Sequence, residues 1–543
     1  MRRLVIGAAI AGITLLNVVQ FPGHTWLGSD TQIYMPILEH IWDPGALDKD
    51  LVATHPHVAF TLYDETAIAL RKLTGLDFRH VLQFQQVVFR ILGIWGVYLI
   101  ATALGLSDAL ALLVTAVFSL GATILGPSVL IFEYEPVPRG FAVPLIFFAI
   151  GLAAHHRYLG ASAAGSAAFL IHPPTAAPFW AVYFCLALWS GKPEIKRERV
   201  QSMWLLAGSV VALLIAARIE AAAGETQAFF TRLTPHQEQL QQLRTSYNWI
   251  SLWWNRFLVH YLILYAATLL ACWRLRDRTP EALRFFLVGL PLIGMLSMPA
   301  SYLLLEKVHW ALIPQFQPMR NVLFVTAMAM ILGVAAGCRA LADKSYAEAV
   351  VWMALAYIVP ANREVVPLSW NRATVIVVLA LIACMAIWAV ESGRRWSILP
   401  LGAAVLAPFF LIPGWGHIQN YSSMSHPEID RLAAWASAAT ARDAVFLFPT
   451  ADQDLTPGVF RVEAERAVYV DWKSGGQVNF FQDLGEEWWS RWQKTMAVPF
   501  DPQNLAKYRA LRIDYLVLSP KDPRPNAVPV FENAQFVVFR PAG

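Results

Sequence analysis

The sequence predicts a mainly α-helical, multi-pass membrane protein that ends in a small α/β domain. Hydrophobic residues make up 57% of the 543 residues and charged residues only 15%, whereas an average soluble protein has about 25% charged residues. The apolar residues fall into long runs that approach the roughly 20 residues a helix needs to cross a bilayer. After residue 414 these runs shorten to strand length.

About thirteen apolar segments are predicted to form membrane helices. Several are short, and His172-Pro173-Pro174 interrupts one long apolar stretch, so tilted, paired or re-entrant helices are alternatives there. The segments are residues 4–20, 86–105, 109–131, 140–154, 159–172, 175–190, 202–218, 256–273, 285–304, 321–339, 346–360, 373–391 and 397–413.

The charges of the connecting loops predict the orientation. If Arg2 and Arg3 lie in the cytoplasm, alternation of the helices puts most Lys- and Arg-rich loops on the same side, as the positive-inside rule requires. We expect the first segment to be kept as a helix, because no small-residue cleavage site follows it. The outer side then holds the first loop, residues 21–85, and everything after about residue 414. These features predict a multi-pass protein of the bacterial inner membrane with a cytoplasmic N-terminus.

The tail, residues 415–543, is predicted to be a periplasmic α/β domain that follows a transmembrane domain over residues 1–414. The net charge is only +4 and no dense basic cluster is present, which argues against a nucleic-acid partner. The four cysteines have no Cys-x-x-Cys spacing, so neither a disulfide framework nor a zinc site is predicted. Strand-length runs at 444–448, 467–470, 515–518 and 536–539 alternate with helix-like stretches at 426–441 and 486–496.

Asp30 follows the first apolar segment by a few residues, on the predicted outer side. Carboxylates at a membrane boundary are costly and therefore indicate function. Asp30 could act as a general base or as a metal ligand. The alternative is that Ser29 or Asp30 caps a helix over residues 31–42.

Glu133 and Glu135 lie in the short outer turn between the third and fourth segments. The Glu-x-Glu spacing puts both carboxylates within reach of one divalent cation, and Mg²⁺ or Mn²⁺ prefers such oxygen ligands. Arg139 supplies a counter-charge nearby; the alternative is a solvated turn with a local Glu–Arg pair. Because Asp30 and this turn share the outer face, we expect them to form one active site and a candidate metal site.

Other outer residues are candidates for supporting roles. Arg320 suits a lipid-linked phosphate, with interfacial snorkelling as the alternative. His172 could contact the same phosphate or have a structural role at a helix end. In the tail, Arg461, Arg466, Asp471 and Lys473 could bind an acceptor or form a salt-bridged strand edge. The remaining site candidates, of which the first three could add metal ligands, are His55, His57, Asp64 and Glu306, and the alternative for the two histidines is that they are solvated loop residues.

This arrangement resembles the GT-C superfamily of membrane glycosyltransferases. The shared features are the acidic residue soon after the first helix (Asp30), the acidic pair in the second outer loop (Glu133 and Glu135) and the outer C-terminal domain. The layout is most similar to the catalytic subunit of oligosaccharyltransferases. The second-loop pair here lacks the usual Asp, and Trp488-Trp489 is not followed by Asp-Tyr-Gly, so this chain departs from the sequon-transferring branch.

The resemblance implies a polyprenyl-phosphate-linked sugar donor, a bilayer partner and an acceptor that is a glycan, lipid or protein. In it, Asp30 would be the general base or a metal ligand, Glu133 and Glu135 would hold a cation or orient the acceptor, and Arg139, Arg320 and His172 would neutralise the lipid phosphate. A transporter or flippase, which would want charges in mid-membrane, and a non-catalytic scaffold are the alternatives.

Overall fold

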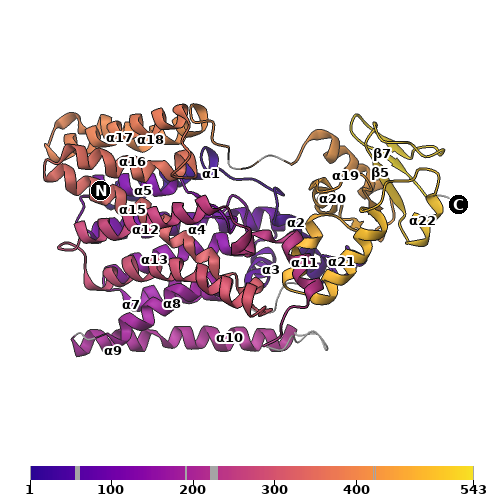
Figure 1. The fold of residues 1–543 in the computed structure, drawn as a ribbon, viewed down its shortest axis with the longest axis horizontal. Helices are drawn as coiled ribbons and strands as arrows, with labels where there is room; N and C mark the ends of the chain where they lie inside the picture. The colour runs from indigo at the N-terminus through magenta and orange to yellow at the C-terminus, as the bar shows by residue number, and fades with distance from the viewer. Residues whose placement is uncertain are drawn as a thin grey trace.

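The computed structural model describes residues 2–55, 61–189, 192–220, 230–419, 421 and 424–541. Figure 1 shows an elongated molecule in which a helical part, with the N-terminus, lies beside a smaller α/β part at the C-terminus. The fold is therefore mainly helical with a small C-terminal sheet, as the sequence predicted.

Each predicted membrane segment contains one helix. The described chain has eight helical spans long and apolar enough to cross a membrane, together with four shorter apolar helices, so the protein is a multi-pass membrane protein. Length alone thus supports fewer crossings than the sequence predicted. The helices are α1 (Arg2–Val19), α4 (Phe78–Ala103), α5 (Asp108–Ser119), α6 (Pro138–Ala154), α7 (Tyr158–Ile171), α8 (Pro173–Leu188), α10 (Trp204–Glu220), α12 (Asn255–Arg274), α13 (Glu281–Ser301), α15 (Val322–Ala342), α16 (Tyr346–Asn362), α17 (Trp370–Glu391) and α18 (Ile398–Gly414).

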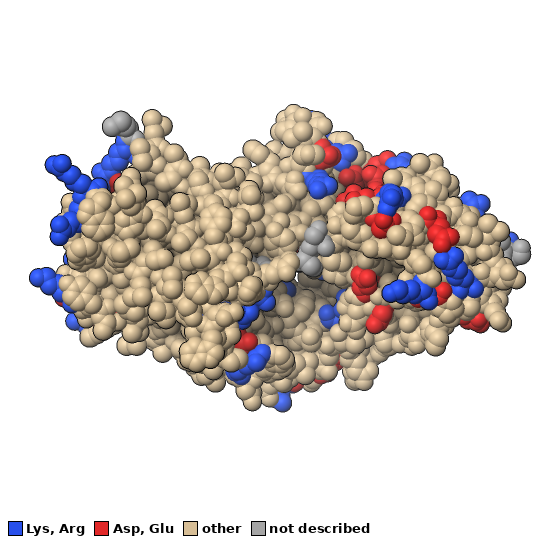
Figure 2. Space-filling view, turned by 90° about the horizontal axis from the view of Figure 1, so that it is seen from above, with Lys and Arg blue, Asp and Glu red and all other residues tan. Residues whose placement is uncertain are grey.

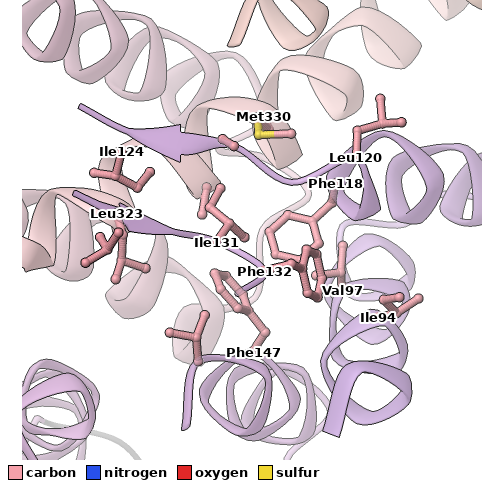
Figure 3. Packing of buried hydrophobic residues seen from close by; sticks show 14 of the residues in the cluster. Ile94, Val97, Phe118, Leu120, Ile124, Ile131, Phe132, Phe147, Leu323 and Met330 are labelled. Atoms are coloured by element: carbon pink, nitrogen blue, oxygen red, sulfur yellow. The ribbon is translucent and has the colours of Figure 1, made fainter. Parts of the chain in front are cut away.

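The predicted helix over 109–131 is wrong in its second half. After α5 the chain forms an antiparallel hairpin of β1 (Thr123–Ile124) and β2 (Val129–Leu130). Gly121 and Gly126 have φ angles of +66° and +89°, a backbone region that suits glycine and ends the helix. The run is apolar because the hairpin is buried. Figure 3 shows this packing, in which Ile124, Ile131 and Phe132 lie among Phe118, Phe147, Leu323 and Met330.

Small residues and a central helix set the packing of the helical part. A Cβ on Gly96 of α4 would lie 2.4 Å from the backbone of Phe147 in α6, so only glycine allows these two helices to approach so closely. The apolar window of the span that contains α15 is completely buried, and α15 contacts α12, α13, α16 and α5. The other helices therefore surround α15.

Shorter elements join the long helices. They cover the two ends of the helical part, one facing the tail and one opposite it. They are α2 (Thr31–Trp42), α3 (Tyr63–Thr74), α9 (Pro193–Ser202), α11 (Pro235–Arg244), η1 (Ser246–Asn248), η2 (Ile250–Leu252), η3 (Tyr302–Lys307), α14 (Ile313–Phe316), η4 (Pro318–Asn321) and η5 (Arg395–Ser397). In Figure 1, α2, α3 and α11 lie beside the tail, whereas α9 lies at the far end.

The tail contains a mixed five-stranded sheet of order β4-β3-β5-β7-β6, in which β3 pairs parallel with β4 and β5, and β7 pairs antiparallel with β5 and β6. All four predicted strands are present, and β6 is a short fifth. The strands are β3 (Val445–Leu447), β4 (Ala467–Val468), β5 (Tyr515–Leu518), β6 (Phe531–Glu532) and β7 (Val537–Phe539), and the helices are α19 (Pro427–Ala439), α20 (Thr456–Ala464), η6 (Lys473–Asn479), α21 (Gln482–Thr495) and α22 (Leu505–Ala510).

A buried ion network joins the tail to the first loop. Arg461 of α20 lies 2.7 Å from Asp50 of the loop and 2.8 Å from Asp471, and all three side chains have no exposed surface. Asp50 also accepts a hydrogen bond from the backbone of Val468 at 2.9 Å. Because a buried charge is stable only when it is paired, this network requires the two parts to stay in contact.

The surface charges divide the molecule into zones. In Figure 2 the end far from the tail carries Lys and Arg, the middle of the helical part is almost free of charge, and the tail carries both signs. A charge-free belt is the surface that lipid tails require, and a basic end is typical of the cytoplasmic side.

Candidate active site between the helical part and the tail

The turn with the two predicted glutamates is held by buried groups on both sides. Before it, Phe132 stacks edge-on against Phe118, with ring centroids 5.3 Å apart. Arg90 of α4 donates to the carbonyl oxygen of Glu133 at 2.6 Å and to that of Gly23 at 3.0 Å. Because Arg90 is buried, it fixes the second outer turn against the end of the first helix.

Glu133 forms a buried ion pair with Arg139 of α6. Its Oε1 atom lies 2.7 Å from Nε of Arg139, and both side chains are less than 10% exposed. The same oxygen accepts a hydrogen bond from the backbone of Leu130 at 3.1 Å. The Glu–Arg pair considered as the alternative for this turn is thus present, but it is buried rather than solvated.

Glu135 joins the second outer turn to the first loop. Its carboxylate accepts hydrogen bonds from the backbone of Ser29 at 2.9 Å and of Asp30 at 2.8 Å, and from the hydroxyl of Thr31. Burial and the charge of Asp30 raise the pKa of Glu135, although the Thr31 and Ser29 hydrogen bonds oppose this. The structure therefore brings Glu135 and Asp30 together, although about a hundred residues separate them in the chain.

Asp30 stands at the N-cap position of α2, but its side chain makes no capping hydrogen bond. Instead, Oδ1 lies 2.6 Å from Nζ of Lys473 in the tail. No residue that the structure describes donates a hydrogen bond to Oδ2, and the side chain is 41% exposed. Asp30 thus has one fixed oxygen and one open oxygen.

The charge state of Asp30 follows from its neighbours. Removal from water raises the pKa of the Asp30 carboxyl. The positive charges of Lys473, Arg139 and Arg320 outweigh that effect and hold this pKa well below its usual range. Asp30 is therefore ionised over the whole physiological range and can bind a cationic group or accept a proton, and the lowered pKa makes it a weaker base than an ordinary aspartate.

Arg320 of η4 is a partly buried cation beside these carboxylates. Its Nε atom is buried and has no hydrogen-bond partner among the described residues, and its guanidinium lies 5.2 Å from the ring of Tyr247. A buried N–H donor is stabilised by an acceptor, so this atom is available to an oxygen of a ligand. A phosphate oxygen is an acceptor that guanidinium groups bind well.

The other residues that the sequence predicted for the site lie at different places in the structure. Asp64 is 8% exposed and acts electrostatically on Tyr34 of α2, as Asp30 does, so it lies near the site. His55 contacts the carbonyl oxygen of Leu51 at 2.8 Å. His172 caps α8 through a 3.3 Å hydrogen bond from the backbone of Thr175, and Glu306 accepts one from Ser251 at 3.0 Å. His57 lies outside the described residues.

The donor set does not fit the divalent cation that the sequence suggested. Within the described ranges, no group of three or more His, Cys, Asp or Glu side chains is arranged to hold a metal ion. Glu133 is neutralised by Arg139, Asp30 by Lys473, and both oxygens of Glu135 accept hydrogen bonds from protein groups. A cation bound by all three carboxylates would have to displace these partners.

The fold can be compared with those of known proteins. The family model of a domain of unknown function (DUF6798) matches residues 427–510, from the start of α19 to the end of α22. No curated protein sequence matches the chain.

Among solved structures, ArnT from Cupriavidus metallidurans bound to undecaprenyl phosphate is similar with a TM-score of 0.51 at 12% identity, over 99% of this chain and 97% of that one. The apo state of the same protein gives a TM-score of 0.49 at 12% identity, over 99% and 97%. Arabinofuranosyltransferase AftD from Mycobacteria gives 0.48 at 15% identity, over 100% of this chain but 40% of that one. The ArnT match spans both parts of the molecule, so the chain has the fold of the GT-C membrane glycosyltransferases, as its layout predicted.

Proposed function

We propose that this protein is a membrane glycosyltransferase that moves a sugar from a polyprenyl-phosphate-linked donor to an acceptor hydroxyl at the outer face of the membrane. The observation that carries the proposal is the environment of Asp30. Its Oδ2 atom is open, its other oxygen is held by Lys473 of the tail, and the positive charges of Arg139 and Arg320 act on the carboxylate and keep it ionised.

The open oxygen suits Asp30 to the role of general base. Oδ2 takes the proton of the acceptor hydroxyl while the hydroxyl oxygen attacks the anomeric carbon of the donor sugar. The bond from that carbon to the phosphate oxygen breaks, and its electron pair leaves with the polyprenyl phosphate. A positioned carboxylate in this role contributes about 10²–10⁴-fold to the rate.

The leaving phosphate gains negative charge as the bond breaks, and a fixed cation stabilises that charge most effectively away from bulk water. Arg320 has an unsatisfied donor to offer, and Arg139 adds charge while it stays paired with Glu133. His172 caps α8 through its Nδ1 atom, so its contact with the phosphate in this proposal would come from the second ring nitrogen.

The lipid-linked donor is supported by two further observations. The site residues follow or begin apolar helices, since Asp30 comes after α1 and Arg139 lies at the start of α6, so a lipid chain can stay in the bilayer while its phosphate reaches the polar boundary. A protein of the same fold is described with undecaprenyl phosphate bound. The basic far end supports a cytoplasmic N-terminus and an outward-facing tail, in the bacterial inner membrane.

The test is sugar transfer by the purified, reconstituted protein. Radiolabelled polyprenyl-phosphate sugars and polyprenyl-diphosphate sugars are supplied to the wild type, to Asp30→Asn and to Asp48→Asn, an exposed carboxylate of the same loop. We expect transfer from at least one polyprenyl-phosphate donor by the wild type and Asp48→Asn, and its loss in Asp30→Asn. Equal transfer by all three would contradict the proposal, as would transfer from diphosphate donors alone.

A further inference from the structure

We propose that the tail domain is a fixed part of the active site, and that it acts through Lys473, which positions the Asp30 carboxylate. This inference rests on the proposed function. Lys473 is the first residue of η6, and its Nζ lies 2.6 Å from Oδ1 of Asp30 and 2.8 Å from Oγ of Ser29. Within the described parts of the chain, no other cation lies within salt-bridge distance of Asp30.

The contact differs from an ordinary surface ion pair in its burial. The side chain of Lys473 is only 13% exposed, although it is long and charged. An exposed pair holds two flexible side chains in place for little gain. Here the ammonium group is largely removed from water and donates to two fixed oxygens, so it restricts the rotation of the Asp30 side chain and leaves Oδ2 as the open oxygen.

The backbone that carries Lys473 is fixed from within the tail and from the first loop. Asp471, two residues earlier, is held by Arg461 at 2.8 Å, and Arg461 is held in turn by Asp50 of the helical part. The hydroxyl of Ser474 donates to the carbonyl oxygen of Asp471 at 2.8 Å, which closes the turn at the start of η6.

A second segment of the helical part holds both ends of η6. Arg244 stacks on the ring of Trp472 at 3.7 Å and donates to its carbonyl oxygen. Thr245 donates to the side chain of Asn479, the last residue of η6, at 2.8 Å. Two residues further on, Tyr247 packs against Arg320. The same short segment therefore links Lys473 to the cation that we assign to the phosphate.

Several charged and titratable groups face Asp30, and they act from different elements. Lys473 is distinguished from the others by direct contact, whereas Arg139 and Arg320 act across a longer distance. The groups are Lys473 of η6, Arg139 of α6, Arg320 of η4, Tyr34 of α2, and Glu135 and Tyr134 of the second outer turn. Loss of Lys473 thus removes the one group that can orient the carboxylate as well as stabilise its charge.

The experiment compares transfer by Lys473→Met, Lys473→Arg and Lys521→Met, the last a matched exposed lysine of the tail. A hydrogen bond to a charged group corresponds to about a 10- to 100-fold effect. We expect Lys473→Met to lower kcat by that factor with little change in KM, Lys473→Arg to keep part of the activity, and Lys521→Met to match the wild type. Wild-type kcat in Lys473→Met would overturn the inference.

A chemical rescue separates the ammonium group from a purely structural role. Lys473→Cys is alkylated with 2-bromoethylamine, which rebuilds a lysine-like ammonium, or with iodoacetamide, which adds a neutral amide of similar bulk. Lys473→Met treated in the same way controls for the native cysteines. We expect only aminoethylation to restore kcat; equal restoration by both reagents would contradict the role of the charge.

A measurement without substrate keeps this inference distinct from the proposed function. Melting temperatures are compared for the wild type, Asp30→Asn, Lys473→Met and the double variant. We expect the two single shifts to be non-additive, because the groups are in contact. Additive shifts would overturn the contact even if transfer is observed, whereas non-additive shifts with no transfer from any donor would retain the contact and reject the function.

Discussion

Asp30 and Glu135 are carboxylates of the same site with opposite surroundings. Glu135 is 4% exposed, and both of its oxygens accept hydrogen bonds from the first loop. The Asp30 side chain is 41% exposed, with one oxygen held by Lys473 and the other open. The difference shows that acidic residues at a membrane boundary need not share a role. Glu135 holds the two outer segments together, and the open oxygen of Asp30 suits the role that we propose for it.

The largest effect, a loss of stability, is expected when the Glu133–Arg139 ion pair is broken. Arg139→Met leaves Glu133 as an unpaired buried charge, and breaking a buried pair costs about 3–5 kcal/mol. Unfolding in detergent can be followed by the reaction of the buried thiol of Cys338 with a maleimide dye. Arg2→Met is the matched control, because Arg2 is 80% exposed in its pair with Asp108. Equal losses in both variants would show that the Glu133–Arg139 pair has no structural role.

A smaller loss of stability is expected from Glu135→Gln. The amide keeps one oxygen but places an NH₂ group against one of the backbone N–H donors, so a buried hydrogen bond is lost at a cost of about 1–3 kcal/mol. The same thiol assay measures this change. Glu306→Gln, which removes the charge from an acceptor with one exposed partner, serves as the control. If Glu135→Gln unfolds like the wild type, the comparison with Asp30 fails.

Variants of Arg320 test the other half of the comparison, namely a side chain of the site that is free to bind a ligand. Arg320→Met should raise KM for the lipid-linked donor about tenfold, the value of one lost charge-assisted hydrogen bond, without loss of stability. Arg320→Lys should keep the charge but lose the directional donor. Steady-state kinetics against donor concentration measure both, with Arg256→Met as an exposed control. An unchanged KM in Arg320→Met would remove Arg320 from the donor site.

The smallest expected effect is on the pH dependence of kcat/KM. The pKa of Glu135 is raised by burial and that of Asp30 is lowered by its cationic neighbours, so Glu135 takes up a proton first as the pH falls. The acid limb of kcat/KM should follow Asp30, whose carboxylate must be ionised to take the proton of the acceptor, and should therefore lie below the ordinary pKa of an aspartate. Glu135→Gln should leave this limb in place, because Glu135 takes no part in the proposed proton transfer. A limb that moved in Glu135→Gln would contradict this assignment.

Much of the fold could be predicted from the sequence, because apolar length and loop charge are local properties. Those signals located a helix in every predicted membrane segment and the strands of the tail. They failed after Ser119, where a buried hairpin is as apolar as a helix, and at β6, which has only two residues. Hydrophobicity indicates that a segment is buried, but it does not show whether the buried backbone is a helix or a hairpin.

The candidate site could be predicted only in part. Asp30, Glu133, Glu135 and Arg139 are close to apolar segments, which made them conspicuous. The contact of Lys473 with Asp30 spans 443 residues, and no local pattern indicates such a pairing. The salt bridge expected in the tail exists, but Arg461 shares it with Asp50 of the first loop, and no local pattern indicates that partner.

The most direct test of the account measures transfer and stability together in Asp30→Asn and Glu135→Gln. If Asp30 reacts and Glu135 supports the structure, Asp30→Asn should lose at least about 100-fold in transfer rate and should lose less stability than Glu135→Gln, because it gives up only its contact with Lys473. Asp30→Asn with wild-type transfer, or with the loss of stability expected of Glu135→Gln, would contradict the account.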